Sequence, residues 1–323
     1  MTRHTLPVLL LLLALAVFAP ARAQPGQTHY IPIMGGGQPC RAGFGLEAVP
    51  GPTAGWKDDI AALRPCWLRS NFGSQVAPYD TLYQHYLSGG WAEVDAEIVA
   101  ELELWREIGA KPLVIFMYGG ECVAPTKAQL KPFGDFIVAA IARYNLPRVE
   151  ILNEPDASGG YASLFGCFGV AHVDRLIYLL NYARVRTTAQ VGVSFAGMNA
   201  NQMNMLAAAA PYADWIGIHH YSVWGGGIVM EPWPGGLLEK YNLAVSLASG
   251  KPVWVTEYNL RSPQDECGPA HQEAQKDMIA EALALGLPHL SVLVYWSYPD
   301  WQCTGIRNTI VESWLAGGGY PAP

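Results

Sequence analysis

The sequence predicts an α/β fold, a (β/α)8 TIM barrel that forms a single domain. Short apolar, β-branched or aromatic runs alternate with longer stretches of helical periodicity, as in parallel βαβ units. Eight such units in about 300 residues match a barrel in length. A doubly wound open sheet is the alternative. It is disfavoured because no G-x-G-x-x-G follows the first expected strand, and the GGG stretches at 35–37, 225–227 and 317–319 do not open helices.

The strands are expected where β-branched and aromatic residues cluster between turn residues. Eight runs fit this description: Phe44–Val49, Trp67–Ser70, Leu113–Met117, Val149–Leu152, Val191–Phe195, Trp215–His219, Val253–Thr256 and Ser291–Trp296. Helices are expected between them, among others at Trp91–Ile108, Lys127–Arg143, Val173–Thr187 and Gln272–Leu285. In the first of these helices Val94, Ile98 and Leu102 repeat at helical spacing, which predicts one apolar face toward the sheet.

The first 23 residues are predicted to be a secretory signal peptide. Arg3 precedes an almost unbroken apolar run at Leu6–Ala19, and small residues at Ala21 and Ala23 precede an expected cut before Gln24. An uncleaved anchor is the alternative, but the run is short for a membrane span. The folded domain is therefore expected at residues 24–323, secreted or periplasmic, and without membrane attachment after cleavage.

Composition narrows the classes of partner. The formal net charge is −7 and only 15% of residues are charged, so the chain lacks the basic footprint of a nucleic-acid-binding protein. Trp and Tyr are plentiful, at 11 and 16 residues, and exposed aromatic rings suit stacking on sugars. We therefore expect no nucleic acid as a partner and consider a carbohydrate cleft.

Six cysteines in an exported chain favour disulfides, although six allow fifteen connectivities. No C-x-x-C pair is present, which disfavours a redox or zinc-ribbon motif. The barrel order would place them in neighbouring loops or beside the first two strands. The expected disulfides are Cys40–Cys66, Cys122–Cys167 and Cys267–Cys303.

Chemistry-bearing residues gather where the expected strands end. In a barrel these ends line one mouth, where sites are built. The residues at that rim are Arg69, Tyr118, Asn153, Glu154, His219, Tyr221, Glu257 and Trp296. Glu154 ends the fourth strand and Glu257 the seventh, so the two carboxylates face each other across the mouth. Such a pair can flank a glycosidic bond, at ~5–5.5 Å in retaining enzymes and ~6.5–9.5 Å in inverting ones.

The motifs that carry these residues resemble glycoside hydrolase clan A, the retaining β-glycosidases on (β/α)8 barrels. They are LNEP at the fourth strand, HHY at the sixth, TE at the seventh and Trp at the eighth, in strand order over essentially all of residues 24–323. The resemblance implies Glu154 as acid/base and Glu257 as nucleophile. It further implies a set of supporting residues: Asn153 at the sugar 2-OH, Arg69 and Tyr221 on Glu257, and His219 and Trp296 around the sugar.

The family within the clan stays open between families 5, 39 and 128. The third strand ends in FMYGGEC without the histidine usual in family 5, and Leu152 stands where family 39 often has tryptophan. The H-x-Y pattern of His219 and Tyr221 and the stretch VWVTEY are compatible with family 128. These departures leave the substrate open as well.

The function expected from the sequence is a secreted retaining β-glycoside hydrolase. It would be an endo-β-glycanase, similar to endo-β-glucanases or mannanases, acting on a β-linked polysaccharide or oligosaccharide as a monomer without cofactor. A transglycosylase with the same carboxylate pair and a non-catalytic carbohydrate-binding barrel are the alternatives. Tyr118 and Trp224 are candidates for sugar stacking, with ordinary loop packing as the alternative. No metal site is expected at His219 and His220, because adjacent strand residues point to opposite faces.

Overall fold

The computed structural model describes residues 40, 44–47, 57–72, 80–119, 125–157, 168–231, 233–262, 267–286, 292–295 and 309–317. They all lie in the compact unit Ile33–Pro323. The expected signal peptide at residues 1–23 lies outside the described residues. Within those ranges, no helix is both long enough and apolar enough to cross a membrane.

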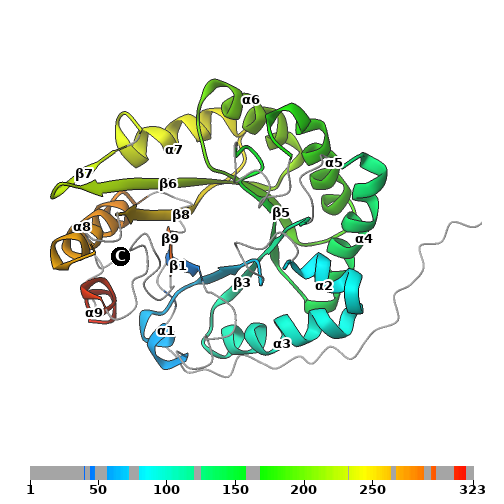
Figure 1. The fold of residues 1–323 in the computed structure, drawn as a ribbon, viewed down its shortest axis with the longest axis horizontal. Coiled ribbons are helices and arrows are strands. Elements are labelled where there is room, and N and C mark those ends of the chain that lie inside the picture. Colours follow the sequence, from blue (N-terminus) through cyan, green and yellow to red (C-terminus); the bar gives the residue numbers. More distant parts are fainter. Residues whose placement is uncertain are drawn as a thin grey trace, which may run out of the picture. The chain divides into compact units, whose positions relative to one another are not determined.

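The strands form one curved sheet, as predicted for a (β/α)8 barrel (Figure 1). Nine are present in the described residues: β1 Phe44–Glu47, β2 Trp67–Ser70, β3 Lys111–Phe116, β4 Arg148–Asn153, β5 Gln190–Phe195, β6 Trp215–Gly225, β7 Ile228–Met230, β8 Val253–Arg261 and β9 Val292–Tyr295. The order is β7-β6-β5-β4-β3-β2-β1-β9, and β8 pairs with β6. All pairings are parallel except β6 with β7. Because β8 also lies against β9, the parallel strands surround one interior.

Helices lie outside the strands and alternate with them along the chain (Figure 1). Those within the described residues are α1 Lys57–Leu63, α2 Leu82–Gly89, α3 Trp91–Glu107, α4 Lys127–Tyr144, α5 Val173–Arg184, α6 Ala200–Ala209, α7 Gly236–Leu247, α8 Pro269–Ala284 and α9 Ile310–Ala316, with short 3-10 turns at Val170–His172 and Ala210–Tyr212. The four helices expected from periodicity correspond to α3, α4, α5 and α8. Local sequence sets their ends: α4 begins at a capping box of Thr126 and Gln129 and stops at Asn145, whose φ is 50°.

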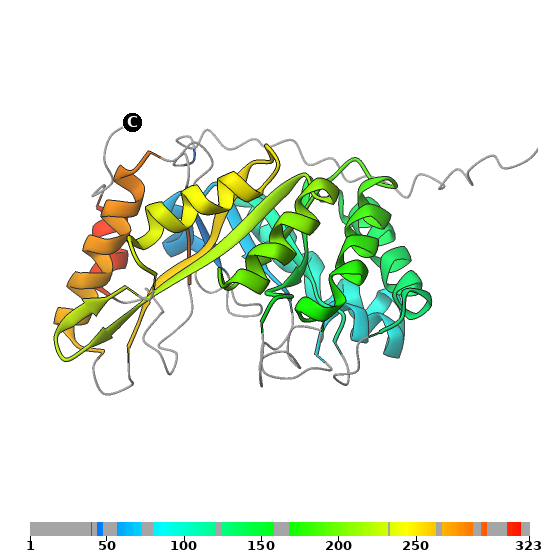
Figure 2. The same ribbon diagram turned by 90° about the horizontal axis from the view of Figure 1, so that it is seen from above.

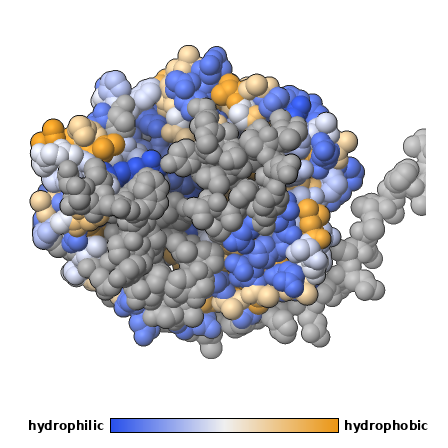
Figure 3. All heavy atoms as spheres, viewed as in Figure 1, coloured by the Kyte–Doolittle hydropathy of each residue, from blue (hydrophilic) through white to orange (hydrophobic). Residues whose placement is uncertain are grey.

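The sixth strand is longer than expected. The prediction ended it at His219, whereas β6 continues to Gly225 and turns back through β7 as a hairpin (Figure 2). The hairpin is held by Glu231, which lies 2.8 Å from His220 Nε2 and accepts a hydrogen bond of 2.6 Å from Ser222. In β7 the apolar side chains of Ile228 and Met230 are exposed. The hairpin lies at the left edge of Figure 1, and Figure 3 shows hydrophobic side chains at this edge of the surface.

One disulfide joins Cys40, just before β1, to Cys66, which directly precedes β2. This is the first of the three expected pairings. Cys267 is also disulfide-bonded. The remaining cysteines of the expected pairs, Cys122, Cys167 and Cys303, lie outside the described residues.

Two one-residue bulges interrupt the parallel ladders close to the carboxyl ends of the strands. In β4 the register advances from Glu150 opposite Gly192 to Asn153 opposite Ser194, so β4 carries one residue more than β5. In β8 it advances from Val255 to Glu257 while β6 advances by a single residue. A bulge reverses which face the following side chains occupy. Residues beyond each bulge therefore point opposite to the direction that simple alternation predicts.

The barrel interior beneath these strand ends is crowded. Thr256, the extra residue of the β8 bulge, donates a hydrogen bond of 2.8 Å from its hydroxyl to Ser194 in β5. Between them lies Gly217 of β6, where an added Cβ would come within 2.0 Å of Ser194 Oγ and 2.6 Å of Thr256 Oγ1. Glycine is needed here because the two hydroxyls occupy the space that a side chain would fill.

We expect Gly217→Ala to lower the free energy of unfolding by about 1–3 kcal/mol, the range for overpacking a close-packed interior. Gly268→Ala is the matched control, because Gly268 has no heavy atom within 4 Å of the added Cβ. Urea denaturation of both variants measures the difference. Equal stability of the two would contradict the close packing described for β5, β6 and β8.

Candidate active site

The site is organised around Arg69, at the carboxyl end of β2. Its side chain is fully buried, and its guanidinium makes a two-pronged ion pair with Glu150 of β4, with both N–O distances at 2.8 Å. The same group donates to Glu257 Oε1 at 2.7 Å and to Asn153 Oδ1 at 2.7 Å. A planar guanidinium with five donors can serve several acceptors at fixed angles. Arg69 therefore positions groups from β4 and β8 relative to each other.

Glu257 is held in its ionised form. Its second oxygen accepts a hydrogen bond from the Tyr221 hydroxyl, while Arg69 occupies the first. Burial alone would raise the pKa of Glu257, but His219, Arg69 and Tyr221 overcome this effect and hold the pKa below the ordinary value for glutamate. A buried carboxylate that keeps its charge is suited to act as a nucleophile.

Glu154 lies on the opposite side of the site and approaches it from β4. Its backbone has a φ of 49°, and its amide donates to Ser194 O at 3.1 Å. A positive φ at a non-glycine residue is uncommon and costs conformational energy, so surrounding contacts must hold it. Leu152, within the bulge, also has a positive φ, of 62°. The strained exit of β4 is what directs Asn153 and Glu154 inward.

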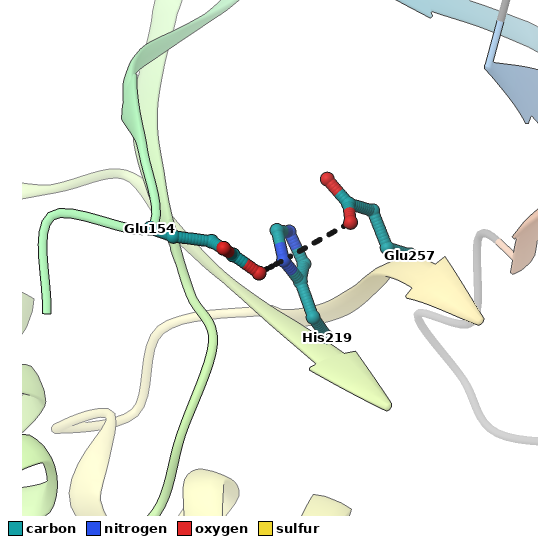
Figure 4. Close-up of side chains that lie close together, drawn as sticks. All are labelled: Glu154, His219 and Glu257. Atoms are coloured by element: carbon teal, nitrogen blue, oxygen red, sulfur yellow. Dashed lines mark hydrogen bonds and ion pairs between the residues drawn. The ribbon is translucent and has the colours of Figure 1, made fainter. Parts of the chain in front are cut away.

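His219 stands between the two carboxylates, and all three side chains point toward one another (Figure 4). Its Nδ1 lies 2.6 Å from Glu154 Oε1 and 3.3 Å from Glu257 Oε2. Burial acts to lower the pKa of His219, but the charge of Glu257 and the charge and hydrogen bond of Glu154 hold it above its ordinary value. Because the folded protein binds this proton more tightly than the unfolded chain does, protonation of His219 stabilises the fold. This stabilisation is complete at pH values below the pKa of the histidine in the unfolded chain, and it is lost as the pH rises through the pKa of His219 in the folded protein.

The separation of the carboxylates is short. One oxygen of Glu154 and one of Glu257 lie within 4.8 Å of each other. This spacing matches the ~5–5.5 Å of two carboxyl groups that act as nucleophile and acid/base, and is below the ~6.5–9.5 Å that leaves room for an intervening water. The Glu154 side chain is 16% exposed against 4% for Glu257, so Glu154 is the one that solvent reaches more readily.

The same three residues form the one group within the described ranges with metal-ligating types this close together. Two ligands bound at 2.0–2.1 Å in a tetrahedral zinc site lie roughly 3.3 Å apart. The 2.6 Å between His219 Nδ1 and Glu154 Oε1 is instead the distance of a hydrogen bond. The observed geometry therefore fits a shared proton rather than a shared ion.

The aromatic candidates differ in their placement. Tyr118 is half-buried and packs on Tyr83 and Phe133, with ring centroids 5.8 and 5.4 Å away. Trp224, for which sugar stacking and ordinary packing were both open, is buried and packs edge-on against His271 at 6.0 Å. It faces away from the mouth because it shares its side of β6 with His220. Trp296 lies outside the described residues.

Three buried charged residues of this region were not among the sequence candidates. They are Glu150, Asp156 and Lys240. Glu150 is a charged residue within the apolar run VEIL, an exception to the pattern that should have indicated a partner inside the barrel. Asp156 follows the NEP motif and resembles an ordinary turn residue. Lys240 lies on a helix, where a lysine gives no signal of burial.

No protein-family model matches the chain, and no curated protein matches it. Among solved structures, the family 1 β-glucosidase from Thermotoga maritima has a TM-score of 0.58 at 12% identity, covering 83% of this chain and 85% of its own. The GH51 α-L-arabinofuranosidase from Thermotoga petrophila RKU-1 has 0.57 at 13%, covering 80% and 62%. A glucosidase from Croceicoccus marinus has 0.57 at 13%, covering 84% and 64%.

These similarities show a shared barrel fold. Glycosidase families 1 and 51 both belong to clan A. The resemblance to clan A predicted from the strand-end motifs therefore holds at the level of the fold, with the family unresolved.

We expect Glu150→Gln to lower the free energy of unfolding by about 3–5 kcal/mol, because it removes one partner of a fully buried ion pair. Glu107→Gln is the control: Glu107 pairs with Lys57 at 2.5 Å, but both side chains are exposed, so the cost should stay below about 1 kcal/mol. Denaturant unfolding at neutral pH measures both. Similar small losses would mean that Arg69 does not depend on Glu150.

Proposed function

We propose that this protein is a retaining β-glycoside hydrolase. The observation that carries the proposal is the arrangement of Glu154 and Glu257, whose oxygens lie within 4.8 Å of each other on either side of His219. Glu257 is the nucleophile, because Arg69 and Tyr221 stabilise its charge. Glu154 is the acid/base, because it is the more exposed carboxyl group and contacts an imidazole rather than a guanidinium.

The reaction proceeds by two displacements. Glu257 attacks the anomeric carbon while Glu154 protonates the departing glycosidic oxygen, which leaves a glycosyl ester on Glu257. Esterification removes the charge of Glu257 as Glu154 becomes ionised. Glu154 then deprotonates a water that attacks the same carbon, releasing the sugar and restoring both groups. Asn153, held by Arg69 at 2.7 Å, presents an amide toward the sugar hydroxyl next to the reacting carbon.

The proposed substrate is a β-linked polysaccharide, cleaved internally as by an endo-β-glucanase or mannanase. The motifs NEP, HHY and TE support the β-glycosidase chemistry. The fold neighbours are named as a β-glucosidase, a glucosidase and an arabinofuranosidase, which supports glycosides as the general substrate class. Product sizing on β-glucans, mannan, xylan and galactans distinguishes internal from terminal cleavage and identifies the sugar.

The proposal includes export and a monomeric state. The apolar run near the N-terminus and the small residues before Gln24 support a signal peptide at residues 1–23 and a catalytic domain at 24–323. A polysaccharide is too large to enter a cell intact, so a secreted or periplasmic location agrees with the proposed substrate. N-terminal sequencing of the exported protein tests the cleavage position.

We expect Glu257→Ala to abolish turnover, because no covalent intermediate can form. Glu154→Gln should slow hydrolysis of glycosides with poor leaving groups by about 10²–10⁴-fold, the usual contribution of a general acid. It should still form the intermediate from activated aryl glycosides, seen as a burst of aryl alcohol. Glu273→Ala, at an exposed ion pair on α8, is the control and should keep full activity.

Other outcomes separate the alternatives. A binding barrel would retain carbohydrate affinity and show no turnover in the wild type, so Glu257→Ala would change nothing. A transglycosylase would give longer products when acceptor sugar is in excess. NMR of the first-formed product reports the anomeric configuration, and an inverted product would contradict the assignment of Glu257 as nucleophile.

We expect Tyr221→Phe to move the acidic limb of the kcat/KM profile to higher pH by about one unit. The lost hydroxyl stabilises the ionised form of Glu257, and a charge-assisted hydrogen bond is worth roughly 1.5 kcal/mol, or about one pKa unit. Tyr258→Phe is the control, because its hydroxyl donates to Met278 O, at 3.1 Å, rather than to Glu257. An unmoved limb in Tyr221→Phe would remove Tyr221 from the nucleophile's environment.

A further inference from the structure

A buried lysine lies behind the site, on a helix that the mechanism does not use. Lys240 belongs to α7 and is only 7% exposed. Its ammonium donates to the backbone carbonyl of Ala196, at 3.1 Å, and to that of His219. Ala196 directly follows β5, and His219 carries the imidazole between the two carboxylates. Lys240 therefore connects two neighbouring strands at the level of the active site.

A buried carboxylate, that of Asp156, binds the peptide segment at Ala196 as well. Asp156 follows Glu154 by two residues and is 1% exposed. Its two oxygens accept from the amides of Ala196 and Gly197, each at 2.9 Å. Ala196 is thus bound through its N–H by Asp156 and through its C=O by Lys240. The loop that carries Glu154 and the strand that carries His219 are joined through this one peptide segment.

Burying an ammonium group is costly unless its charge is used. Burial lowers the pKa of Lys240 to about 8, and the charges of Asp156 and Glu154 limit the fall. At this position a neutral side chain would therefore cost less free energy to bury than the charged lysine does. Two backbone carbonyls alone do not require a cation, since any neutral donor can satisfy them.

We propose that Lys240 is a positioning residue for the acid/base Glu154, acting with Asp156 as a charge-balanced couple. It holds His219 by the backbone so that the imidazole meets Glu154, and its positive charge favours the ionised form that Glu154 takes when the leaving group departs. The inference rests on the proposed function, since it assigns Lys240 a role in that reaction. Lys240 touches neither substrate nor the reacting carboxylates.

The electrostatic effect has a definite sign. Within the described residues, the charged or titratable groups around Glu154 and its neighbour Glu257 include His219 from β6, Arg69 from β2, Asp156 from the loop of Glu154 and Lys240 from α7. Removing the positive charge of Lys240 makes ionisation of Glu154 harder. Removing the negative charge of Asp156 makes it easier. The two substitutions should therefore move the alkaline limb of activity in opposite directions.

The test compares pH profiles of kcat/KM for Lys240→Met and Asp156→Asn with the wild type, on phenyl and 2,4-dinitrophenyl β-glycosides of the sugar that the substrate panel selects. With the phenyl glycoside, which needs an acid, Lys240→Met should move the alkaline limb up by about half a unit or more, and Asp156→Asn should move it down. The dinitrophenyl glycoside needs no acid to leave, so both variants should cleave it at a rate within a few fold of the wild type. Lys240→Arg keeps the positive charge, so the alkaline limb of its kcat/KM profile should stay at the wild-type pH.

Lys131→Met, at an exposed i,i+4 pair on α4, is the matched control and should leave the profiles unchanged. Equal rate losses on both glycosides with an unmoved limb would show a structural role only and overturn the proposal. Full activity of Lys240→Met would also overturn it. If Lys240→Met does not fold, Asp156→Asn and Lys240→Arg decide by the same criterion. Absence of turnover in the wild type would instead contradict the proposed function.

Discussion

The ion pair of Arg69 with Glu150 is the interaction on which the site depends. A guanidinium buried at the carboxyl ends of the barrel strands needs a permanent anion, and Glu150 supplies it through two hydrogen bonds of 2.8 Å. Because Glu150 fixes the plane of the guanidinium, the remaining donors point in set directions. One reaches Glu257 and another reaches Asn153. A permanent ion pair thus orients the groups proposed to change charge or bind sugar during the reaction.

The bulges in β4 and β8 bring side chains into the site that would face away from it on regular strands. Glu150 and Asn153 are three residues apart and would face opposite sides of an unbroken β4, yet both bind Arg69. In β8 an unbroken ladder would set His220, rather than His219, beside Glu257. Each bulge adds one residue to its strand, and the side chains after it therefore occupy the opposite face. At the end of β4 the backbone is strained, as the positive φ of Leu152 and Glu154 shows, and the contacts of the site offset this strain.

Several acidic and basic side chains surround the two proposed catalytic carboxylates, Glu154 and Glu257. Glu154, Glu257, Glu150 and Asp156 bring four carboxyl groups into one region of the barrel, with Arg69 and Lys240 as the basic side chains among the contacts described above. His219 lies between the two exchanging carboxylates, and its raised pKa follows from their charges. In the proposed reaction Glu257 loses its charge by esterification, while Glu154 becomes charged by giving its proton to the departing glycosidic oxygen. The proposed double displacement requires such a shift of charge between the two carboxylates.

The sequence by itself determined the barrel and most of the rim. Alternating strand and helix patterns are local, and residues at the carboxyl ends of parallel strands must share one edge, so Arg69, Asn153, Glu154, His219, Tyr221 and Glu257 could be placed together from the sequence alone. Only the tertiary structure decided which way these side chains point. The bulges in β4 and β8 arise from pairing between strands, which periodicity within one strand does not encode. For the same reason Glu150, Asp156 and Lys240 were missed, and the choice between sugar stacking and packing at Trp224 stayed open: burial and partners depend on segments far apart in the chain.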